Sequence, residues 1–252
     1  MKPFPISVQL YSVRDEAAKD FTGVLKKIAG MGYVGVEPAG LHGMTPQEVR
    51  TVLDDLGLVC SSTHGGMPTE DNVNEIVETA GALGYKRHVS GFGSDWFKDK
   101  ESTLRAAASV QKAAELLKPH GLSFGMHNHW FEFDKKFDGK YPHQVLMDAA
   151  PDAFAQIDTY WTFVGGADPA RVVREYGARA PLLHVKDGPG KTGEPMTAVG
   201  AGVMNWADVI GAAADTTEWL IVELDACATD MMTAVAESYD YLVSNGFARG
   251  NK

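Results

Sequence analysis

Two cysteines are all that this 252-residue sequence contains, and they do not form a CxxC pair. Cys60 and Cys227 lie far apart in the chain, so the sequence predicts neither a disulfide framework nor a zinc site made of thiolates. Chains without disulfides are typical of reducing compartments, and we therefore expect a cytoplasmic protein.

Long apolar runs and an excess of positive charge are also missing. No segment approaches the roughly 18 to 20 consecutive apolar residues of a membrane span, and the first stretch, MKPFPISVQLYSVRD, is too polar for a signal peptide. The net charge of −10 repels the phosphate groups that supply most non-specific affinity for nucleic acids and anionic membranes. We expect a soluble protein that binds neither of them.

Amphipathic helical patterns alternate with short apolar runs along the chain. Apolar residues recur with the helical period in three stretches, at residues 21–28, 49–56 and 73–80. Glycine readily adopts the left-handed conformation that ends many helices, and four glycines precede apolar runs: Gly32, Gly57, Gly84 and Gly121. Helix starts are predicted at TPQE, which has the form of a capping box from Thr45, and at Asp168 before Pro169.

Eight short apolar segments predict eight strands: ISVQLY, YVGVE, LVCSSTH, KRHVSG, LSFGMHNH, FAQID, LLHVKD and WLIVELD. Each is followed by a helical pattern or by a loop that leads to one, and GPGKTGEP and GVMNWADVI are interpreted as loop. The sequence therefore predicts an α/β fold, a single (β/α)8 TIM barrel domain over residues 1–252. A doubly wound sheet is the alternative, but no glycine-rich nucleotide-binding motif opens a helix.

Polar residues occupy the carboxyl ends of nearly all these strands, where a TIM barrel places its active site. They are Gln9, Tyr11, Glu37, His64, Ser90, His127, His129, Asp158, His184, Lys186 and Glu223. A single histidine is more often structural, and Glu37 before a proline is equally consistent with a solvated turn. Asp158, His184 and Glu223 each lie in a strongly apolar segment, where an unpaired charge is costly. Together these three favour a functional site.

Histidines and carboxylates without thiolates suit Mn, Co, Zn or Mg. His127 and His129 are two residues apart in a strand, so they share a face, whereas Asn128 points to the other. One histidine of the pair can bind metal while the other acts as a base or contacts substrate. Another carboxylate, Glu132, follows within the same motif.

These motifs together resemble the sugar phosphate isomerase/epimerase superfamily, the xylose isomerase-like TIM barrels that also include apurinic/apyrimidinic endonucleases. The resemblance covers nearly the whole chain and rests on the order of QLYSVRD, GYVGVE, SSTHGG, MHNHWFEF, QIDTYW with GGADP, LLHVKDG and IVELD. It implies one divalent metal ion with four ligands carried over by position: His127, Asp158, His184 and Glu223. Many relatives have Glu-Asn-His where this chain has His127-Asn128-His129. Either His127 binds through nitrogen, or three protein ligands hold the metal.

The endonuclease branch has a histidine where this chain has Trp161, and an Asp-x-His pair that VGAGVMNW lacks. The resemblance instead implies a sugar isomerase or epimerase that removes an α-proton through an enediolate from a ketose, inosose or keto-sugar. A lyase or dehydratase acting on a 3-keto-glycoside or keto-sugar at the same site is the alternative, as is a metal-free barrel that binds sugar.

The resemblance also suggests roles for individual residues. Glu223 and His129 are the candidate bases, and Lys186 is placed to neutralise an oxyanion. Substrate contacts are expected from Glu37, His64 and Trp161. The expected partner is a small sugar, and members of the superfamily often form homo-oligomers, as dimers or tetramers.

Overall fold

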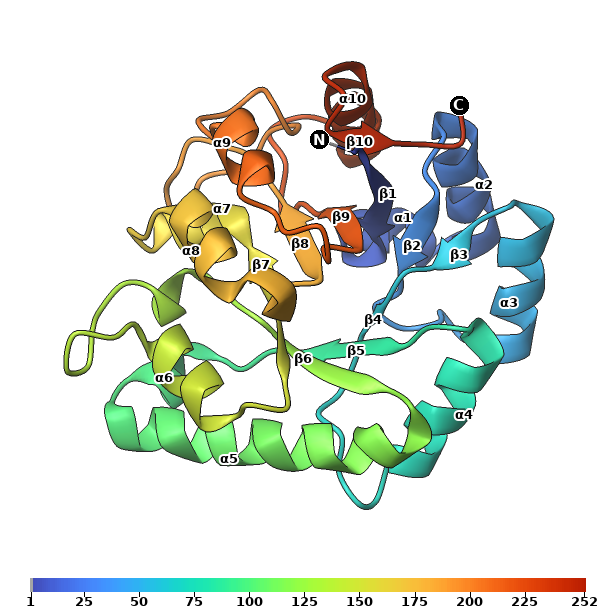
Figure 1. The fold of residues 1–252 in the computed structure, drawn as a ribbon. Coiled ribbons are helices and arrows are strands. Elements are labelled where there is room, and N and C mark those ends of the chain that lie inside the picture. Colours follow the sequence, from blue (N-terminus) through green and yellow to red (C-terminus); the bar gives the residue numbers. More distant parts are fainter. Residues whose placement is uncertain (1) are drawn as a thin grey trace.

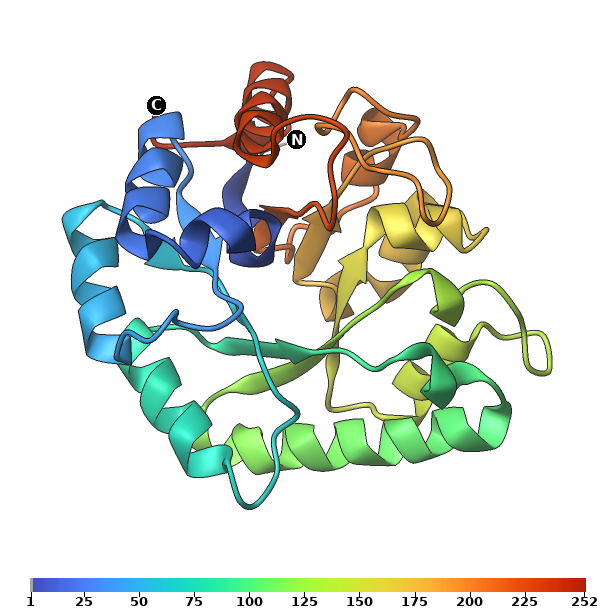
Figure 2. The same cartoon turned by 180° about the vertical axis from the view of Figure 1, so that it is seen from behind.

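A ring of parallel strands forms the centre of the molecule in the computed structural model, which describes residues 2–252. The hydrogen-bonded order along the sheet is β3-β2-β1-β9-β8-β7-β6-β5-β4, and helices surround the strands in both views (Figure 1, Figure 2). The strands are β1 (Phe4–Gln9), β2 (Gly35–Glu37), β3 (Val59–Cys60), β4 (Thr63–His64), β5 (Arg87–Ser90), β6 (Ser123–His127), β7 (Phe154–Asp158), β8 (Leu182–Val185), β9 (Trp219–Val222) and β10 (Ala248–Arg249). The predicted TIM-barrel fold is confirmed.

The third predicted strand, LVCSSTH, is interrupted. Its two pieces, β3 and β4, stand at the two ends of the strand order. β3 pairs with β2 and β4 pairs with β5, while Ser61 and Ser62 separate the two pieces. Because β3 and β4 follow each other directly in the chain, the interrupted strand closes the barrel. The short β10, which was not predicted, pairs with the start of β1.

The helices include α2, α3 and α4 at the three predicted stretches. The full set is α1 (Arg14–Ala17), α2 (Phe21–Met31), α3 (Pro46–Asp55), α4 (Val73–Leu83), α5 (Lys100–Leu117), α6 (Pro142–Ala149), α7 (Thr159–Val164), α8 (Pro169–Tyr176), α9 (Trp206–Gly211) and α10 (Met231–Ser244). All four predicted helix-ending glycines have positive φ. The capping box at Thr45 and the cap at Asp168 are also present.

One loop prediction was wrong, because α9 begins inside GVMNWADVI. The side chain of Asn205 accepts a hydrogen bond from the backbone of Asp208 and thereby caps the helix. Trp206 and Ile210 are buried, so one face of this helix packs on the barrel.

The barrel interior changes from apolar to polar along the strands. Val89, Phe154, Leu182 and Ile221 form a separate apolar cluster. His184 is two residues after Leu182, and Glu223 is two after Ile221, so the strand period turns each polar residue to the same side as the apolar one before it. The apolar cluster therefore supports a polar layer at the carboxyl ends of the strands.

No helix in residues 2–252 combines the length and apolar character needed to cross a membrane.

Candidate metal centre and active site

Four neighbouring strands bring the four predicted metal ligands together. His127 ends β6, Asp158 ends β7, His184 lies in β8, and Glu223 directly follows β9. One ligand atom from each lies within 4.8 Å of those from the other three, and all four residues are buried. Residues separated by almost a hundred positions thus form one cluster because their parallel strands end at the same rim.

His184 lies between two carboxylates. Its Nδ1 is 2.7 Å from Oε2 of Glu223, and its Nε2 is 2.8 Å from Oε1 of Glu37. Burial by itself lowers the pKa of His184, but the two neighbouring carboxylates raise it to about 10. The ring is therefore an imidazolium in this arrangement, and it must lose a proton before either nitrogen can bind a metal.

Glu37 is fully buried, and its carboxylate is surrounded by donors. Oε1 accepts from Gln9 Nε2 at 2.6 Å, and Oε2 accepts from Gln156 Nε2 at 2.7 Å and from the Ser62 hydroxyl. Burial tends to raise the pKa of Glu37, but His184, together with His64 and the Ser62 hydroxyl, lowers it overall. The structure places Glu37 against His184 and not along the cavity described below.

Gln156 sets the orientation of His127. The amide nitrogen of Gln156 donates to Glu37, so its Oε1 is an acceptor, and this oxygen lies 3.0 Å from Nδ1 of His127. Nδ1 therefore carries the proton, and Nε2 keeps its lone pair 3.8 Å from Oδ2 of Asp158. Burial holds the pKa of His127 well below its ordinary value, so the ring is neutral, as a metal ligand must be.

Asp158 caps the start of α7 and presents its second oxygen to the cluster. Oδ1 accepts from the Trp161 backbone at 2.8 Å. Oδ2 lies 3.0 Å from Nζ of Lys186, but within residues 2–252 it has no partner of hydrogen-bonding geometry. Asn128 does not line the cavity, and it fixes Asp158 by accepting from its backbone nitrogen at 2.9 Å.

Lys186 is a buried cation among three carboxylates. Its Nζ is 2.7 Å from Glu223, 2.9 Å from Asp225 and 3.0 Å from Asp158. Burial tends to lower the pKa of Lys186, but these carboxylates raise it well above its ordinary value. Lys186 is therefore charged, and it neutralises part of the cluster.

This donor set fits a divalent cation. The buried Oδ2 of Asp158 and the free Nε2 of His127 are acceptors without a hydrogen-bond donor in the described chain. Nitrogen and carboxylate oxygen together suit Zn, Mn, Co or Mg. Gln156 contacts one ring nitrogen of His127, and Glu37 contacts one ring nitrogen of His184. Metal-binding histidines usually have such a hydrogen-bond partner on the nitrogen that does not bind the metal.

His129 and Glu132 form a second unit at the edge of the cluster. The His129 backbone nitrogen donates to Oε2 of Glu132 at 2.9 Å. Nδ1 of His129 lies 3.7 Å from Oε1 of Glu132, and both atoms are buried without a hydrogen-bond partner among residues 2–252. Burial opposes a charged His129, but Glu132 raises its pKa overall. Sequence reasoning noticed Glu132 in the motif without assigning it a role.

A cavity of about 320 Å³ opens onto this cluster. Its walls are Gln9, Tyr11, Ala39, His64, His127, His129, Glu223 and Asp225. His64, a predicted substrate contact, is one of these wall residues. Trp161 does not line this cavity: its Nε1 donates to Asp225 at 3.2 Å, and its ring lies 5.6 Å from Nζ of Lys186.

Two further residues of the site, Gln156 and Asp225, were missed by sequence reasoning. Gln156 lies two residues before Asp158 in an apolar segment, and Asp225 lies two residues after Glu223. The spacing of two could have indicated both.

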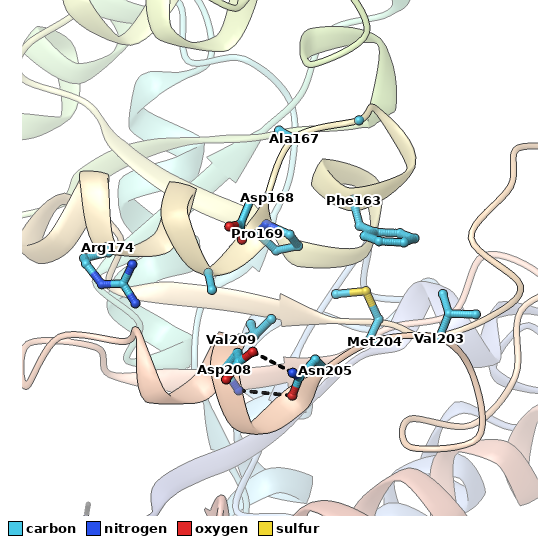
Figure 3. Close-up of a pocket in the computed structure, with 12 residues that line it drawn as sticks. Phe163, Ala167, Asp168, Pro169, Arg174, Val203, Met204, Asn205, Asp208 and Val209 are labelled. Atoms are coloured by element: carbon cyan, nitrogen blue, oxygen red, sulfur yellow. Dashed lines mark hydrogen bonds between the residues drawn. The ribbon is translucent and has the colours of Figure 1, made fainter.

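A larger cavity of about 540 Å³ lies elsewhere, between α8 and α9 (Figure 3). Figure 3 shows Phe163, Val203 and Met204 near one end of it and Arg174 at the other. None of the predicted site residues lines this cavity. We therefore assign the candidate active site to the smaller cavity, which reaches the titratable cluster at His127 and Glu223.

Comparisons with known proteins agree with this architecture. A family model described as "Xylose isomerase-like TIM barrel" matches residues 25–244. No curated protein matches the sequence significantly.

Several solved structures share the fold. One is a sugar phosphate isomerase/epimerase from Parabacteroides distasonis, with a TM-score of 0.80, 22% identity, and coverage of 99% of this chain and 96% of the other. The probable 3-DHS dehydratase AsbF from Bacillus anthracis has a TM-score of 0.74, 14% identity, and coverage of 96% and 99%. A xylose isomerase-like TIM barrel protein from Mycobacterium smegmatis, in complex with magnesium, has a TM-score of 0.71, 14% identity, and coverage of 98% and 100%. At these identities the similarity shows the fold alone.

Proposed function

Because this chain belongs to the family of xylose isomerase-like TIM barrels, we propose that it is a divalent-metal-dependent sugar isomerase or epimerase. It would remove an α-proton next to the carbonyl group of a ketose, an inosose or another keto-sugar. The observation that carries this proposal is the cluster of His127, Asp158, His184 and Glu223, whose ligand atoms lie within 4.8 Å of one another.

The metal would be held by these four residues, with His127 binding through Nε2. For His184 we assign Nδ1, because Glu37 is anchored by three other donors and keeps Nε2. When bound, a divalent ion supplies electrostatic stabilisation of the negative charge that develops on the substrate oxygens.

His129 is the better placed of the two candidate bases. It lines the cavity, and its ring is about one-third exposed, so its outer nitrogen can reach a substrate. Glu132 lies on the Nδ1 side of the ring and orients it, as a carboxylate orients the histidine in other proton-transfer sites. Oε2 of Glu223 is already close to His184 and Lys186, which makes Glu223 the second candidate.

Lys186 and His64 complete the proposed site. We assign Lys186 the neutralisation of developing oxyanion charge, because its ammonium group is buried beside the proposed ligands Asp158 and Glu223, where that charge would develop. His64 lies 5.2 Å from His127 between ring centroids and lines the cavity, where it would contact the substrate. Glu37 acts through His184, so we assign it a positioning role.

Proton exchange in deuterium oxide tests the proposal. The purified protein, loaded in turn with Mn, Co, Zn and Mg, is incubated with ketoses, inososes and 3-keto-glycosides. We expect deuterium to enter the substrate at the carbon next to the carbonyl, and only when metal is present. Product analysis then separates isomerisation or epimerisation from elimination by a lyase, which begins with the same proton removal.

A matched histidine pair provides the control. His184→Gln should abolish exchange and metal binding, whereas His120→Gln, which changes an exposed histidine, should leave both unchanged. Sugar binding without exchange in any metal-loaded sample would favour the metal-free binding protein and refute the proposed enzyme.

A further inference from the structure

We propose that the substrate is an uncharged sugar, and that Asp225 excludes phosphorylated and other anionic sugars from the cavity. This inference rests on the proposed function and names the substrate class of the same site. It concerns the outer part of the cavity, which the metal cluster does not occupy.

The walls of the cavity lack the two residue types that most often bind a phosphate. Its eight lining residues include no lysine and no arginine, but they include the carboxylates Glu223 and Asp225. Sites that bind phosphate groups usually supply arginine, lysine or several backbone N–H groups. A substrate with a phosphate would therefore bring its charge next to Glu223 and Asp225 with no lysine or arginine facing it, because the three histidines on the wall are already assigned to metal binding, proton transfer and substrate contact.

Asp225 is held rigidly with one oxygen free. Its Oδ2 lies 2.9 Å from Nζ of Lys186 and 3.2 Å from Nε1 of Trp161. Oδ1 accepts no hydrogen bond from any of residues 2–252, and about 37% of the side chain is exposed. A fixed carboxylate with a free oxygen is a good acceptor for a sugar hydroxyl and repels an anion.

Neither of the two nearby cations, Lys186 and Arg14, lines the cavity. Lys186 is buried, does not line the cavity and is shared among three carboxylates, so its charge faces the cluster and not the outer part of the cavity. Arg14 donates to the backbone oxygens of Tyr11 and Asp225, at 2.9 Å each, and its guanidinium carbon lies 4.2 Å from the Tyr11 ring centroid. These contacts hold both residues in place, and Arg14 itself does not line the cavity.

Tyr11 supplies an apolar surface beside this carboxylate. It lines the cavity and is 45% exposed. An exposed ring beside a hydrogen-bond acceptor is well suited to the C–H face and hydroxyl groups of a neutral sugar. This position, and not Trp161, offers the aromatic contact.

The experiment compares matched sugar pairs that differ only by a phosphate: D-ribulose with D-ribulose 5-phosphate, and D-fructose with D-fructose 6-phosphate. Deuterium exchange gives kcat/KM for each, and calorimetry gives its binding constant. We expect the free sugar to be favoured at least about tenfold, the factor by which one unfavourable charge contact commonly changes affinity. Asp225→Asn should reduce this preference, and Asp225→Lys should reduce it further or reverse it.

Asp55 provides the matched control, because it is an exposed carboxylate in α3. Asp55→Asn and Asp55→Lys should leave the preference unchanged, and thermal melting checks that every variant is folded. A wild-type preference for the phosphate esters, or equal effects at positions 55 and 225, would overturn the inference while leaving the enzyme proposal intact. If no sugar exchanges its proton, the enzyme proposal fails, and the binding constants of the same pairs still decide the charge preference.

Discussion

Glu37 and His184 form a fully buried ion pair, in which Oε1 of the glutamate lies 2.8 Å from Nε2 of the histidine. The two residues are far apart in the sequence and reach each other across the barrel interior from β2 and β8. A carboxylate in this position fixes both the orientation and the protonated nitrogen of a histidine whose other nitrogen is a proposed metal ligand.

Replacing Glu37 tests this relationship. Glu37→Gln should lower metal affinity about 10- to 100-fold, the usual effect of losing such an outer partner. Affinity is measured by titrating the metal-free protein with a competing chelator. The exposed Glu78→Gln in α4 is the control and should bind as the wild type does. Unchanged affinity in Glu37→Gln would contradict the positioning role.

Removing the metal should lower thermal stability. A ligand that binds only the folded state at 100 times its dissociation constant adds about 2.7 kcal/mol to the free energy of unfolding. We expect addition of a chelator to lower the melting temperature of the metal-loaded wild type. Asp158→Asn removes a proposed ligand and should show no such difference. If Asp158→Asn responds to chelator as the wild type does, Asp158 is not a ligand.

Glu132 should affect catalysis more than binding. Its carboxylate lies 3.7 Å from Nδ1 of His129, and it is not among the residues that line the cavity. Glu132→Gln should therefore lower kcat about 10-fold or more while changing KM little, in line with the range typical of proton-transfer groups. Steady-state kinetics on the exchanging substrate measure both constants, and Glu132→Asp should restore part of kcat. A change confined to KM would refute the assignment.

Gly125 in β6 should tolerate no side chain. A Cβ atom there would overlap three ring atoms of Phe154, inside the apolar cluster of the barrel. Gly125→Ala should lower the free energy of unfolding by about 1–3 kcal/mol, as overpacking usually does. Gly81→Ala in α4 has open space and should instead stabilise by roughly 0.5–1 kcal/mol. Urea unfolding of both variants checks the opposite signs.

The buried His143 should lower the free energy of unfolding of the protein in mild acid. Burial, together with the nearby Arg179, lowers the pKa of His143 to about 3 in the folded protein, whereas the unfolded value is about 6.5. Between these values the unfolded chain binds the extra proton and the folded chain does not, so stability falls as the pH falls below about 6.5. At pH 5 this histidine alone should cost roughly 2 kcal/mol.

The matched pair His143→Gln and His120→Gln tests this assignment by urea unfolding at pH 7.5 and pH 5. His143→Gln removes the titrating group and should weaken the dependence on pH. His120 is exposed, and His120→Gln should keep the full dependence. Equal pH dependence in the two variants would show that another group is responsible.

Sequence patterns predicted much of the fold because the signals are local. The helical period at residues 21–28, 49–56 and 73–80, with a glycine after each stretch, marks α2, α3 and α4 with little help from tertiary contacts. The break between β3 and β4 and the start of α9 were missed. The backbone nitrogen of Ser61 donates to the backbone oxygen of Val36 in β2, and α9 packs Trp206 and Ile210 on the barrel. The strand break and the helix start therefore both depend on residues that are distant in the chain.

Local sequence patterns are enough to predict which residue types reach the rim, because strand period and strand ends place His127, Asp158, His184 and Glu223 there. What each side chain contacts depends on the folded chain. Strand register brought Gln156 to His127 and Glu37 to His184, and loop packing put Tyr11, not Trp161, on the cavity wall. The physical reason is that a strand sets on which side a residue lies, whereas hydrogen bonds and burial depend on partners that are distant in the chain.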